Sequence, residues 1–196
     1  MRRSILPIAI MLATVAATAI AGQAATMEYQ TILDKLTSAG PARIFLDVEV
    51  VTLPEKDRGD PDPLLVSETA RLEALLAGKT GVTLEGSFDG SSLAAAELAS
   101  KRARPPSTTA PSFAEETAQK KLSAEHDAQI AAMAPNATRI LIVRIINLRS
   151  GNRDLYETTA RLLEAGSQKE VARDSGWTSS RNGKPLARFV NGWRLK

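Results

Sequence analysis

The chain carries few of the side chains on which enzymes most often depend. It has one histidine, His126, and no cysteine. The absence of cysteine excludes a disulfide scaffold, thiol catalysis, iron–sulfur clusters and cysteine-ligated zinc. A single histidine also excludes a metal site with several histidine ligands. We therefore expect no metal ion and no cofactor, and we assign no catalytic residue.

His126 lies on the apolar stripe of a predicted helix, four residues from Leu122 and four from Ile130. Glu125 and Asp127 are its neighbours in sequence, but they point to other faces of a helix. Two interpretations are open. His126 is a general base near the rim of a cleft, or it is a partly buried histidine bonded to a backbone carbonyl group. We favour the second, because most residues on an apolar helix face are simply packed.

The first 24 residues have the organisation of an export signal. Two arginines precede an uncharged apolar run from Ile5 to Ile20, and small residues follow. This order predicts a cleavable signal peptide over residues 1–24, removed after Ala21 or Ala24. The alternative is an uncleaved anchor, which is disfavoured because the run is short for a span of about 20 residues. A cleaved signal and the lack of cysteine together predict a bacterial periplasmic location, with no transmembrane segment in the mature chain.

Charge is unevenly distributed along the chain of 196 residues. Residues 26–138 contain 11 basic and 17 acidic residues, whereas residues 139–196 contain 12 basic and 5 acidic ones. A basic carboxy-terminal third fits an acidic partner or lipid head groups. The alternative, which we favour, is that the two parts neutralise each other within one fold.

The carboxy-terminal tail combines basic and aromatic residues, and no acidic residue occurs after position 180. Such mixtures suit a protein interface. The candidate partner-binding residues are Arg181, Lys184, Arg188, Phe189, Trp193 and Arg194. The tail over 185–193 is predicted as a short helix, on which Phe189 and Trp193 would pack against the sheet. Partner binding and packing are equally supported interpretations.

Hydrophobic periodicity predicts an α/β protein. Helices are expected over 29–36, 63–77, about 91–99 and 112–134, and strands over 43–52, 82–84, 139–148, 155–163 and 170–177. The strand at 43–52 alternates, so Asp47 and Glu49 are expected on a polar face. Residues 25–196 then form a single α/β domain with a mobile loop near 101–111. The expected architecture is a two-layer sandwich in which a mixed β-sheet ends in an antiparallel meander and the helices pack on one face.

One stretch of this pattern resembles a known family. Asn136-Ala137-Thr138 leads into the apolar strand Ile140–Ile146, a polar turn follows, and Ala160–Ala172 forms a hairpin with a small turn. This resembles the small periplasmic α/β domain of the TolB amino-terminal and curli-secretion lipoprotein type, which also occurs in uncharacterised secreted proteobacterial families. The resemblance implies that fold and a binding or assembly role in the envelope. It implies no catalytic residue, and the anchoring cysteine of the lipoprotein members is absent.

Together these observations predict a periplasmic, non-enzymatic binding or assembly-accessory protein of the cell envelope. The expected partner is another envelope protein or an acidic surface, and no nucleic acid is expected. The alternative is a small periplasmic hydrolase or ligand-binding enzyme with an unrecognised site. A pocket that contains His126 and convergent carboxylates would favour that alternative.

Overall fold

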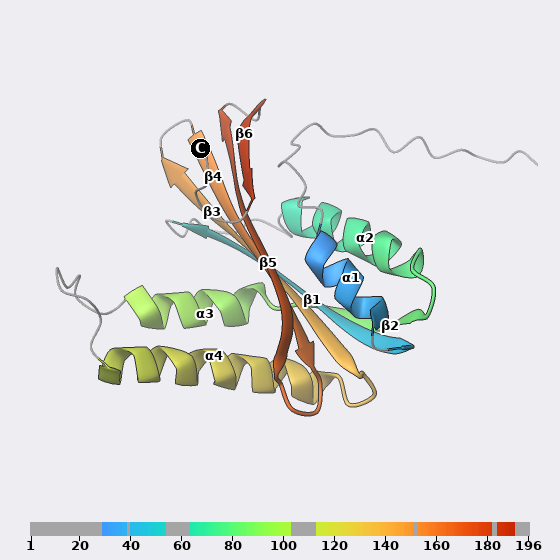
Figure 1. Ribbon diagram of the computed structural model, residues 1–196. Coiled ribbons are helices and arrows are strands. Elements are labelled where there is room, and N and C mark those ends of the chain that lie inside the picture. Colours follow the sequence, from blue (N-terminus) through green and yellow to red (C-terminus); the bar gives the residue numbers. More distant parts are fainter. Residues whose placement is uncertain are drawn as a thin grey trace, which may run out of the picture.

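The structure, a computed structural model, describes residues 29–38, 40–53, 63–102, 113–150, 153–181 and 184–190 (Figure 1). The predicted signal peptide lies outside these residues, as does most of the loop expected near 101–111. The elements in chain order are α1 (Gln30–Ser38), β1 (Ala42–Leu53), α2 (Pro63–Ala77), β2 (Val82–Asp89), α3 (Ser91–Arg102), α4 (Phe113–Met133), β3 (Arg139–Ser150), β4 (Arg153–Glu164), β5 (Glu170–Arg181) and β6 (Lys184–Val190).

Within the described ranges, six strands form one mixed sheet in the order β2-β1-β3-β4-β5-β6. β1 is parallel to β2 and β3, and β3 to β6 follow one another as antiparallel neighbours. The predicted α/β class is therefore confirmed, with its mixed sheet and its antiparallel meander. β3 is apolar on both faces and lies in the middle of the sheet, which explains its nearly continuous run of Ile, Leu and Val.

The prediction of a carboxy-terminal helix is wrong. Lys184–Val190 forms the strand β6, which pairs antiparallel with β5. Phe189 stands opposite Trp177 in this register. Pro185 lacks a backbone N–H donor, and such a residue is tolerated on an outer strand. The meander thus has one strand more than the sequence indicated.

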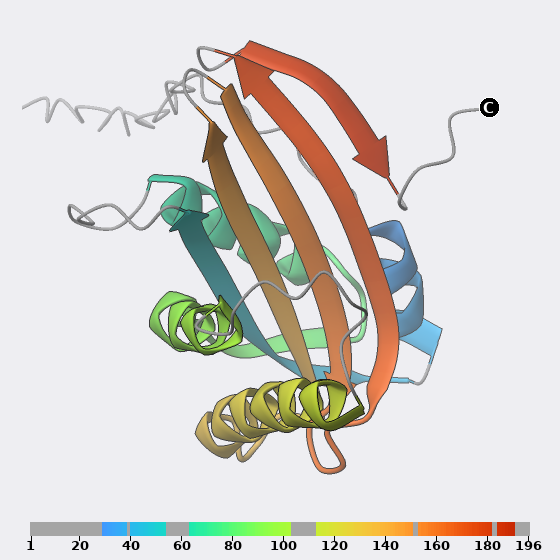
Figure 2. The same ribbon diagram turned by 90° about the vertical axis from the view of Figure 1, so that its left-hand side faces the viewer.

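Helices cover both faces of the sheet, which corrects the expectation of two layers with helices on one face. Figure 2 shows α3 and α4 in front of the strands, and α1 and α2 behind them. Neighbouring residues of β1 confirm this arrangement. Leu46 belongs to an apolar cluster with α1 and α2, whereas Phe45 packs against a second cluster that includes Ile130 of α4. The physical reason is that β1 and β3 have side chains to bury on both faces, so each face requires a helical layer.

The larger apolar cluster lies between the sheet and the α1–α2 layer. Its fully buried members include Ile32 and Leu36 of α1, Leu72 and Leu76 of α2, and alternate residues of the strands. The strand members are Ala42, Ile44, Leu46, Val48, Val50, Leu141, Val143, Ile145, Ala160, Leu162 and Ala172. The two helices are therefore attached to the sheet mainly by the hydrophobic effect.

Tyr29, which directly precedes α1, contacts two residues of α2. Its hydroxyl group donates a hydrogen bond of 2.5 Å to Glu68 Oε1. The guanidinium carbon of Arg71 lies 5.0 Å from the centre of the Tyr29 ring, and Arg71 Nη2 also contacts Glu68 Oε1 at 2.5 Å. This group holds the first described residues against the helical layer.

The second face has a much smaller apolar cluster. Its buried members are Ile130 of α4, Ile140 and Ile142 of β3, and Leu163 of β4. Next to this cluster, β1 and β3 place charged side chains beneath α3 and α4. This face therefore depends on polar contacts that the first face does not need.

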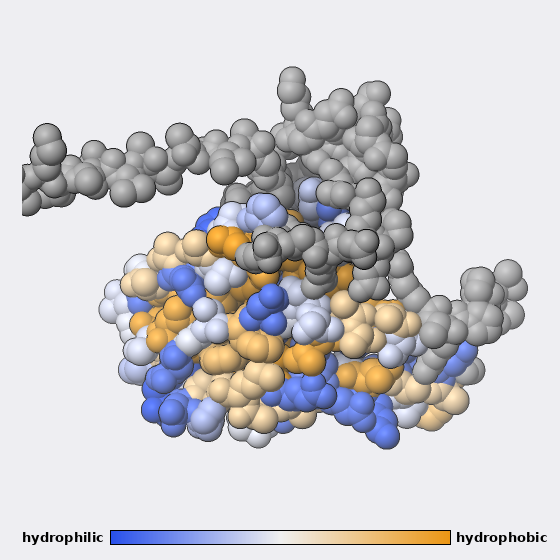
Figure 3. All heavy atoms as spheres, turned by 180° about the vertical axis from the view of Figure 1, so that it is seen from behind, coloured by the Kyte–Doolittle hydropathy of each residue, from blue (hydrophilic) through white to orange (hydrophobic). Residues whose placement is uncertain are grey.

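The described surface offers few large apolar side chains, of which the most exposed are Phe113, Val66 and Met133. Hydrophilic and hydrophobic residues are intermingled on the face shown in Figure 3. None of the helices in the described ranges combines the length and the apolar character needed to cross a membrane.

The helix α2 has one buried and one exposed side, which leads to a first prediction. Leu72→Ala removes a fully buried side chain and is expected to lower the free energy of unfolding by about 2–5 kcal/mol, because it leaves a cavity. Val66→Ala is the matched control on the same helix, where the side chain is 55% exposed, and should cost less than about 0.5 kcal/mol. Urea unfolding curves measure both values. Equal losses would show that α2 does not pack in this orientation.

Candidate functional site

Four of the six predicted partner-binding residues share the β5–β6 hairpin, at one edge of the sheet. Arg181 ends β5 and pairs in register with Lys184, the first residue of β6, and Arg188 stands opposite Thr178. Phe189 also lies on β6. The other two candidates, Trp193 and Arg194, lie outside the described residues. The structure thus brings the basic candidates to one hairpin, on a strand rather than on the predicted helix.

The most unusual polar residues were assigned by sequence to a solvated face. Asp47 and Glu49 lie on β1, and both are completely buried. They are two residues apart on a strand and therefore point to the same side of the sheet, which is the side covered by α3 and α4. The expectation of a polar outer face is wrong because that face also carries a helical layer.

Glu49 is at the centre of the buried contacts. Its Oε2 contacts Arg144 Nε, and its Oε1 lies 2.7 Å from His126 Nε2. Burial alone would raise the pKa of Glu49, but the hydrogen bonds from His126 and Arg144 outweigh it and hold this pKa below its usual range. Glu49 is therefore a charged carboxylate that joins β1 to β3 and to α4.

Arg144 continues the network toward α3. Its Nη2 lies 2.7 Å from Glu97 Oε2, and Glu97 Oε1 accepts hydrogen bonds from Lys101 Nζ at 2.5 Å and from Ser123 Oγ at 2.8 Å. Burial would raise the pKa of Glu97, but Lys101, Arg144 and Ser123 lower it to about 2. Glu97 thus connects α3, α4 and the sheet through one carboxylate.

His126 lies between two carboxylates. Besides its contact with Glu49, its Nδ1 lies 3.5 Å from Asp127 Oδ1. Burial would lower the pKa of His126, but Asp127 and Glu49 raise it to about 9. A histidine that holds its proton at neutral pH is a poor general base. Neither ring nitrogen has a backbone carbonyl partner among the described residues, so the expected bond to a carbonyl group is wrong. His126 does line a hollow of about 200 Å³ together with Glu97 and Glu125.

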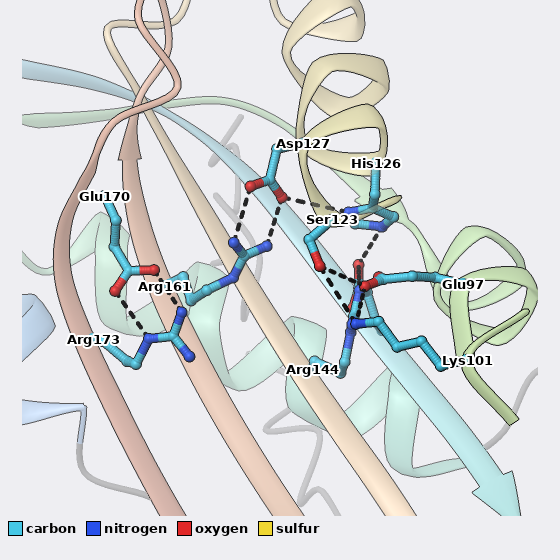
Figure 4. A network of polar contacts seen from close by, with 10 residues as sticks. Glu97, Lys101, Ser123, His126, Asp127, Arg144, Arg161, Glu170 and Arg173 are labelled. Carbon is cyan, nitrogen blue, oxygen red and sulfur yellow. Dashed lines mark hydrogen bonds and ion pairs between the residues drawn. The ribbon is translucent and has the colours of Figure 1, made fainter. Parts of the chain in front are cut away.

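Asp127 has a second partner on the sheet. Arg161 of β4 donates two parallel hydrogen bonds to it, from Nη1 to Oδ2 at 2.9 Å and from Nη2 to Oδ1 at 2.5 Å. Burial raises the pKa of Asp127, but His126 and Arg161 together lower it. Arg173 of β5 makes a similar pair with Glu170 nearby (Figure 4). The ion pairs therefore extend from α4 across β4 to β5.

Asp47 differs from the other buried acids because no donor compensates it. Neither of its carboxyl oxygens has a hydrogen-bond partner in the described part of the chain. Burial, followed by the nearby negative charge of Glu49, raises the pKa of Asp47 to about 8. Gly90 packs directly against this group, since a Cβ at that position would lie 2.4 Å from Asp47 Oδ1.

Three of these residues have the side chains of a metal-binding group. One ligand atom each from Asp47, Glu49 and His126 can be chosen so that all three lie within 4.8 Å of one another. Two come from β1 and one from α4. Sequence reasoning missed this group because His126 lies 77 positions from Glu49 and 79 from Asp47 in the chain, although the acidic pair inside an apolar strand was a visible signal.

A cleft of about 730 Å³ opens beside the network, between α3, α4 and the strands β3 to β5. Its polar lining includes Lys101, Lys120, Asp127, Arg144, Glu157 and Arg161. Asp127, Arg144 and Arg161 are already engaged in the ion pairs described above. The cleft can accommodate a polar ligand. His126 lines a separate hollow of about 200 Å³ with Glu97 and Glu125, and no described hydroxyl group is bonded to it, so no nucleophile–base pair is assembled there.

Comparison with known proteins gives a distant likeness of fold. No model of a protein family matches the sequence, and no curated protein matches it. Among solved structures, lipoprotein GNA1162 from Neisseria meningitidis is 14% identical over 72% of this chain and 85% of its own, with a TM-score of 0.36. The LpoB C-terminal domain from Escherichia coli is 14% identical over 74% and 91%, with a TM-score of 0.35.

A third similar structure is the PelC dodecamer from Paraburkholderia phytofirmans, 15% identical over 72% of this chain and 74% of that one, with a TM-score of 0.37. At these values the likeness carries no argument about function. Membership of the TolB or curli-secretion type stays a prediction.

The environment of Glu97 predicts a loss of stability in acid. Its pKa is about 2 in the folded chain and about 4.3 in an unfolded one. The unfolded state therefore binds more protons between these values, so the stabilisation is complete above about pH 5 and is lost as the pH falls towards 2. We expect the Glu97→Gln variant to melt at a lower temperature than the wild type at pH 7. Its melting temperature should fall less than that of the wild type when the pH is lowered to 3.

Thermal melts followed by circular dichroism from pH 7 to pH 3 test this. The control is Glu116→Gln, at an exposed position of α4, which should reproduce the wild-type profile. A Glu97→Gln profile that runs parallel to the wild type would contradict the proposed role of the carboxylate.

The contact between Gly90 and Asp47 gives a further prediction. Gly90→Ala forces a Cβ into the Asp47 carboxyl group and should destabilise the fold by about 1–3 kcal/mol, the usual cost of overpacking. Gly166→Ala is the control, because nothing lies within 4 Å of a Cβ at that position. Urea unfolding measures both, and the cost of Gly90→Ala should shrink in an Asp47→Ala background. The same cost in both backgrounds would exclude this contact as the cause.

Proposed function

We propose that this chain is an exported bacterial protein that binds another component of the cell envelope without catalysing a reaction. The proposal of export is based on the amino-terminal sequence, in which two arginines precede an apolar run and small residues. The proposal of partner binding is based on the carboxy-terminal hairpin. The observation that carries the proposal is that Arg181, Lys184 and Arg188 come together on the β5–β6 hairpin at the edge of the sheet.

The position of this hairpin suits a binding surface. β6 is the last strand in the sheet order, so within the described residues its outer side has no neighbouring strand. An outer strand presents unpaired backbone groups, and an extended partner segment can pair with them. Residues 139–196 carry 12 basic and 5 acidic side chains. An acidic protein surface is therefore the partner with complementary charge.

The state of the titratable groups supports binding over catalysis. His126 forms ion pairs with Glu49 and Asp127, and Asp127 forms a further ion pair with Arg161. Each of these groups makes an internal ion pair, although Asp127 and Arg161 also line the 730 Å³ cleft and His126 lines a second hollow of about 200 Å³ with Glu97 and Glu125. The hollow that contains His126, Glu97 and Glu125 is the arrangement expected of the hydrolase alternative. A general base must also be free to accept a proton, and His126, whose pKa is raised to about 9, already holds its proton at neutral pH.

The binding proposal predicts the effect of charge reversal on the hairpin. In a triple variant, Arg181, Lys184 and Arg188 are each replaced by Glu. We expect at least about a tenfold loss of retention on acidic envelope partners, because like charges now face each other. The melting temperature should change little. Raising the salt concentration from about 0.05 M to about 0.3 M should weaken the wild-type interaction, since exposed charges are screened.

The measurement is quantitative affinity capture from an envelope extract, with thermal melts of the same samples. The matched control reverses three exposed lysines elsewhere, with Lys35, Lys121 and Lys169 each replaced by Glu. It has the same net charge, so a loss confined to the hairpin variant identifies the surface. If the hairpin variant retains every wild-type partner at both salt concentrations, the binding proposal fails.

A further inference from the structure

The Asp47 carboxyl group is the least compensated part of the buried network. It is completely shielded from solvent, and its two oxygens find no hydrogen-bond donor in the described ranges. A buried carboxylate without a partner costs several kcal/mol. With its pKa raised to about 8, Asp47 must therefore either keep a proton or have its charge compensated by a bound cation.

The groups around Asp47 form a convergent set of donors. Ligand atoms of Asp47, Glu49 and His126 lie within 4.8 Å of one another. The ligands of a tetrahedral zinc ion, each about 2.0–2.2 Å from the metal, are roughly 3.4 Å apart. Small movements of the side chains would bring the three donors to that spacing. One imidazole nitrogen and two carboxylate oxygens are a ligand set that Zn²⁺ accepts.

The surroundings of these donors have the organisation that supports metal ligands. Glu49 Oε1 lies 2.7 Å from His126 Nε2 and accepts a 3.3 Å hydrogen bond from Arg144 Nη2, while Oε2 contacts Arg144 Nε, so Arg144 fixes both oxygens of the carboxylate. His126 directs Nδ1 toward Asp127, and its Nε2 contacts Glu49 Oε1 at 2.7 Å, a contact that a metal ion bound to both atoms would replace. A carboxylate behind the second ring nitrogen is the usual partner of a histidine ligand.

Asp127 is itself held by the two bonds from Arg161. On the other side of the site, Gly90 leaves room for the Asp47 carboxyl group that any larger residue would fill. Each donor thus has an independent feature that sets its orientation. Such preorganisation of donors and their partners is what distinguishes a built site from a chance cluster of charges.

We propose that Asp47, Glu49 and His126 bind one Zn²⁺ ion, which joins β1 to α4 on the second face of the sheet. The two carboxylates neutralise the charge of the cation, and Arg144 and Asp127 orient the ligands from outside. The site is separate from the β5–β6 hairpin, and its role is to hold α4 against the sheet. This inference departs from the sequence expectation that the chain takes no metal.

The first experiment measures metal directly. The purified chain is treated with EDTA, desalted and titrated with Zn²⁺ or Mg²⁺ near pH 8, because metal ligands must be deprotonated. We expect one Zn²⁺ per chain by elemental analysis and a higher melting temperature in its presence. Mg²⁺ should not replace it, since it prefers six oxygen ligands.

Substitutions of the proposed ligands test which residues bind the zinc ion. Asp47→Asn and His126→Gln should each weaken Zn²⁺ binding by at least about 100-fold, because each loses a ligand and outer partners alone account for about 10–100-fold. Glu125→Gln is the matched control, an exposed carboxylate next to His126 on the same helix, and should bind as the wild type does. Zinc binding that survives both ligand variants would overturn the proposal.

A second measurement needs no variant and serves if a ligand variant fails to fold. The chain has one histidine, so every imidazole signal in an ¹⁵N-labelled sample belongs to His126. Zn²⁺ should shift the Nε2 resonance of His126 and leave Nδ1 as the protonated nitrogen. An unchanged His126 spectrum at saturating Zn²⁺, or no retained zinc, would overturn the proposal and leave a proton shared between Asp47 and Glu49 as the compensation.

Discussion

The ion pair between Glu49 and Arg144 is the interaction on which the second face of the sheet depends. Glu49 lies inside the central strand β1 and is completely buried. Arg144 is its register partner on β3, so the parallel pairing of the two strands itself delivers the compensating charge. Arg144 then binds Glu97 of α3, while Glu49 binds His126 of α4. Both helices of this layer are thus attached through the one pair.

The two faces of the sheet are therefore held by different physical means. On the first face, α1 and α2 bury alternate Ile, Leu and Val residues of the strands, and such contacts tolerate small changes in helix position. On the second face, only four buried apolar residues form the cluster, and directional ion pairs complete the attachment. Losing one member of a buried pair costs about 3–5 kcal/mol, whereas an apolar replacement of the whole group can be neutral. The network thus fixes the position of α4 more than it adds stability.

Much of the fold follows from local sequence. The alternation in β1, the apolar run of β3 and the helix boundaries at Pro63 and Gly78 were sufficient for most elements. The carboxy-terminal strand was missed because Phe189 and Trp193 suggested helical spacing. Asn182-Gly183, a dipeptide typical of two-residue hairpin loops, was the stronger signal. The second helical layer was missed because charged residues in β1 were interpreted as facing solvent.

The site was harder to predict because its contacts are not local. Glu49 and Arg144 are 95 positions apart, and neither residue is unusual until the register of β1 and β3 is known. A sequence signal did exist, since both strands are apolar enough to be central and each carries charge at an interior position. A central strand is covered on both faces, so a charged residue inside it needs a compensating charge close by. Two such strands with opposite charges must then be neighbours that compensate each other, which predicts the pairing of β1 with β3 and places the charged site between the sheet and a helix.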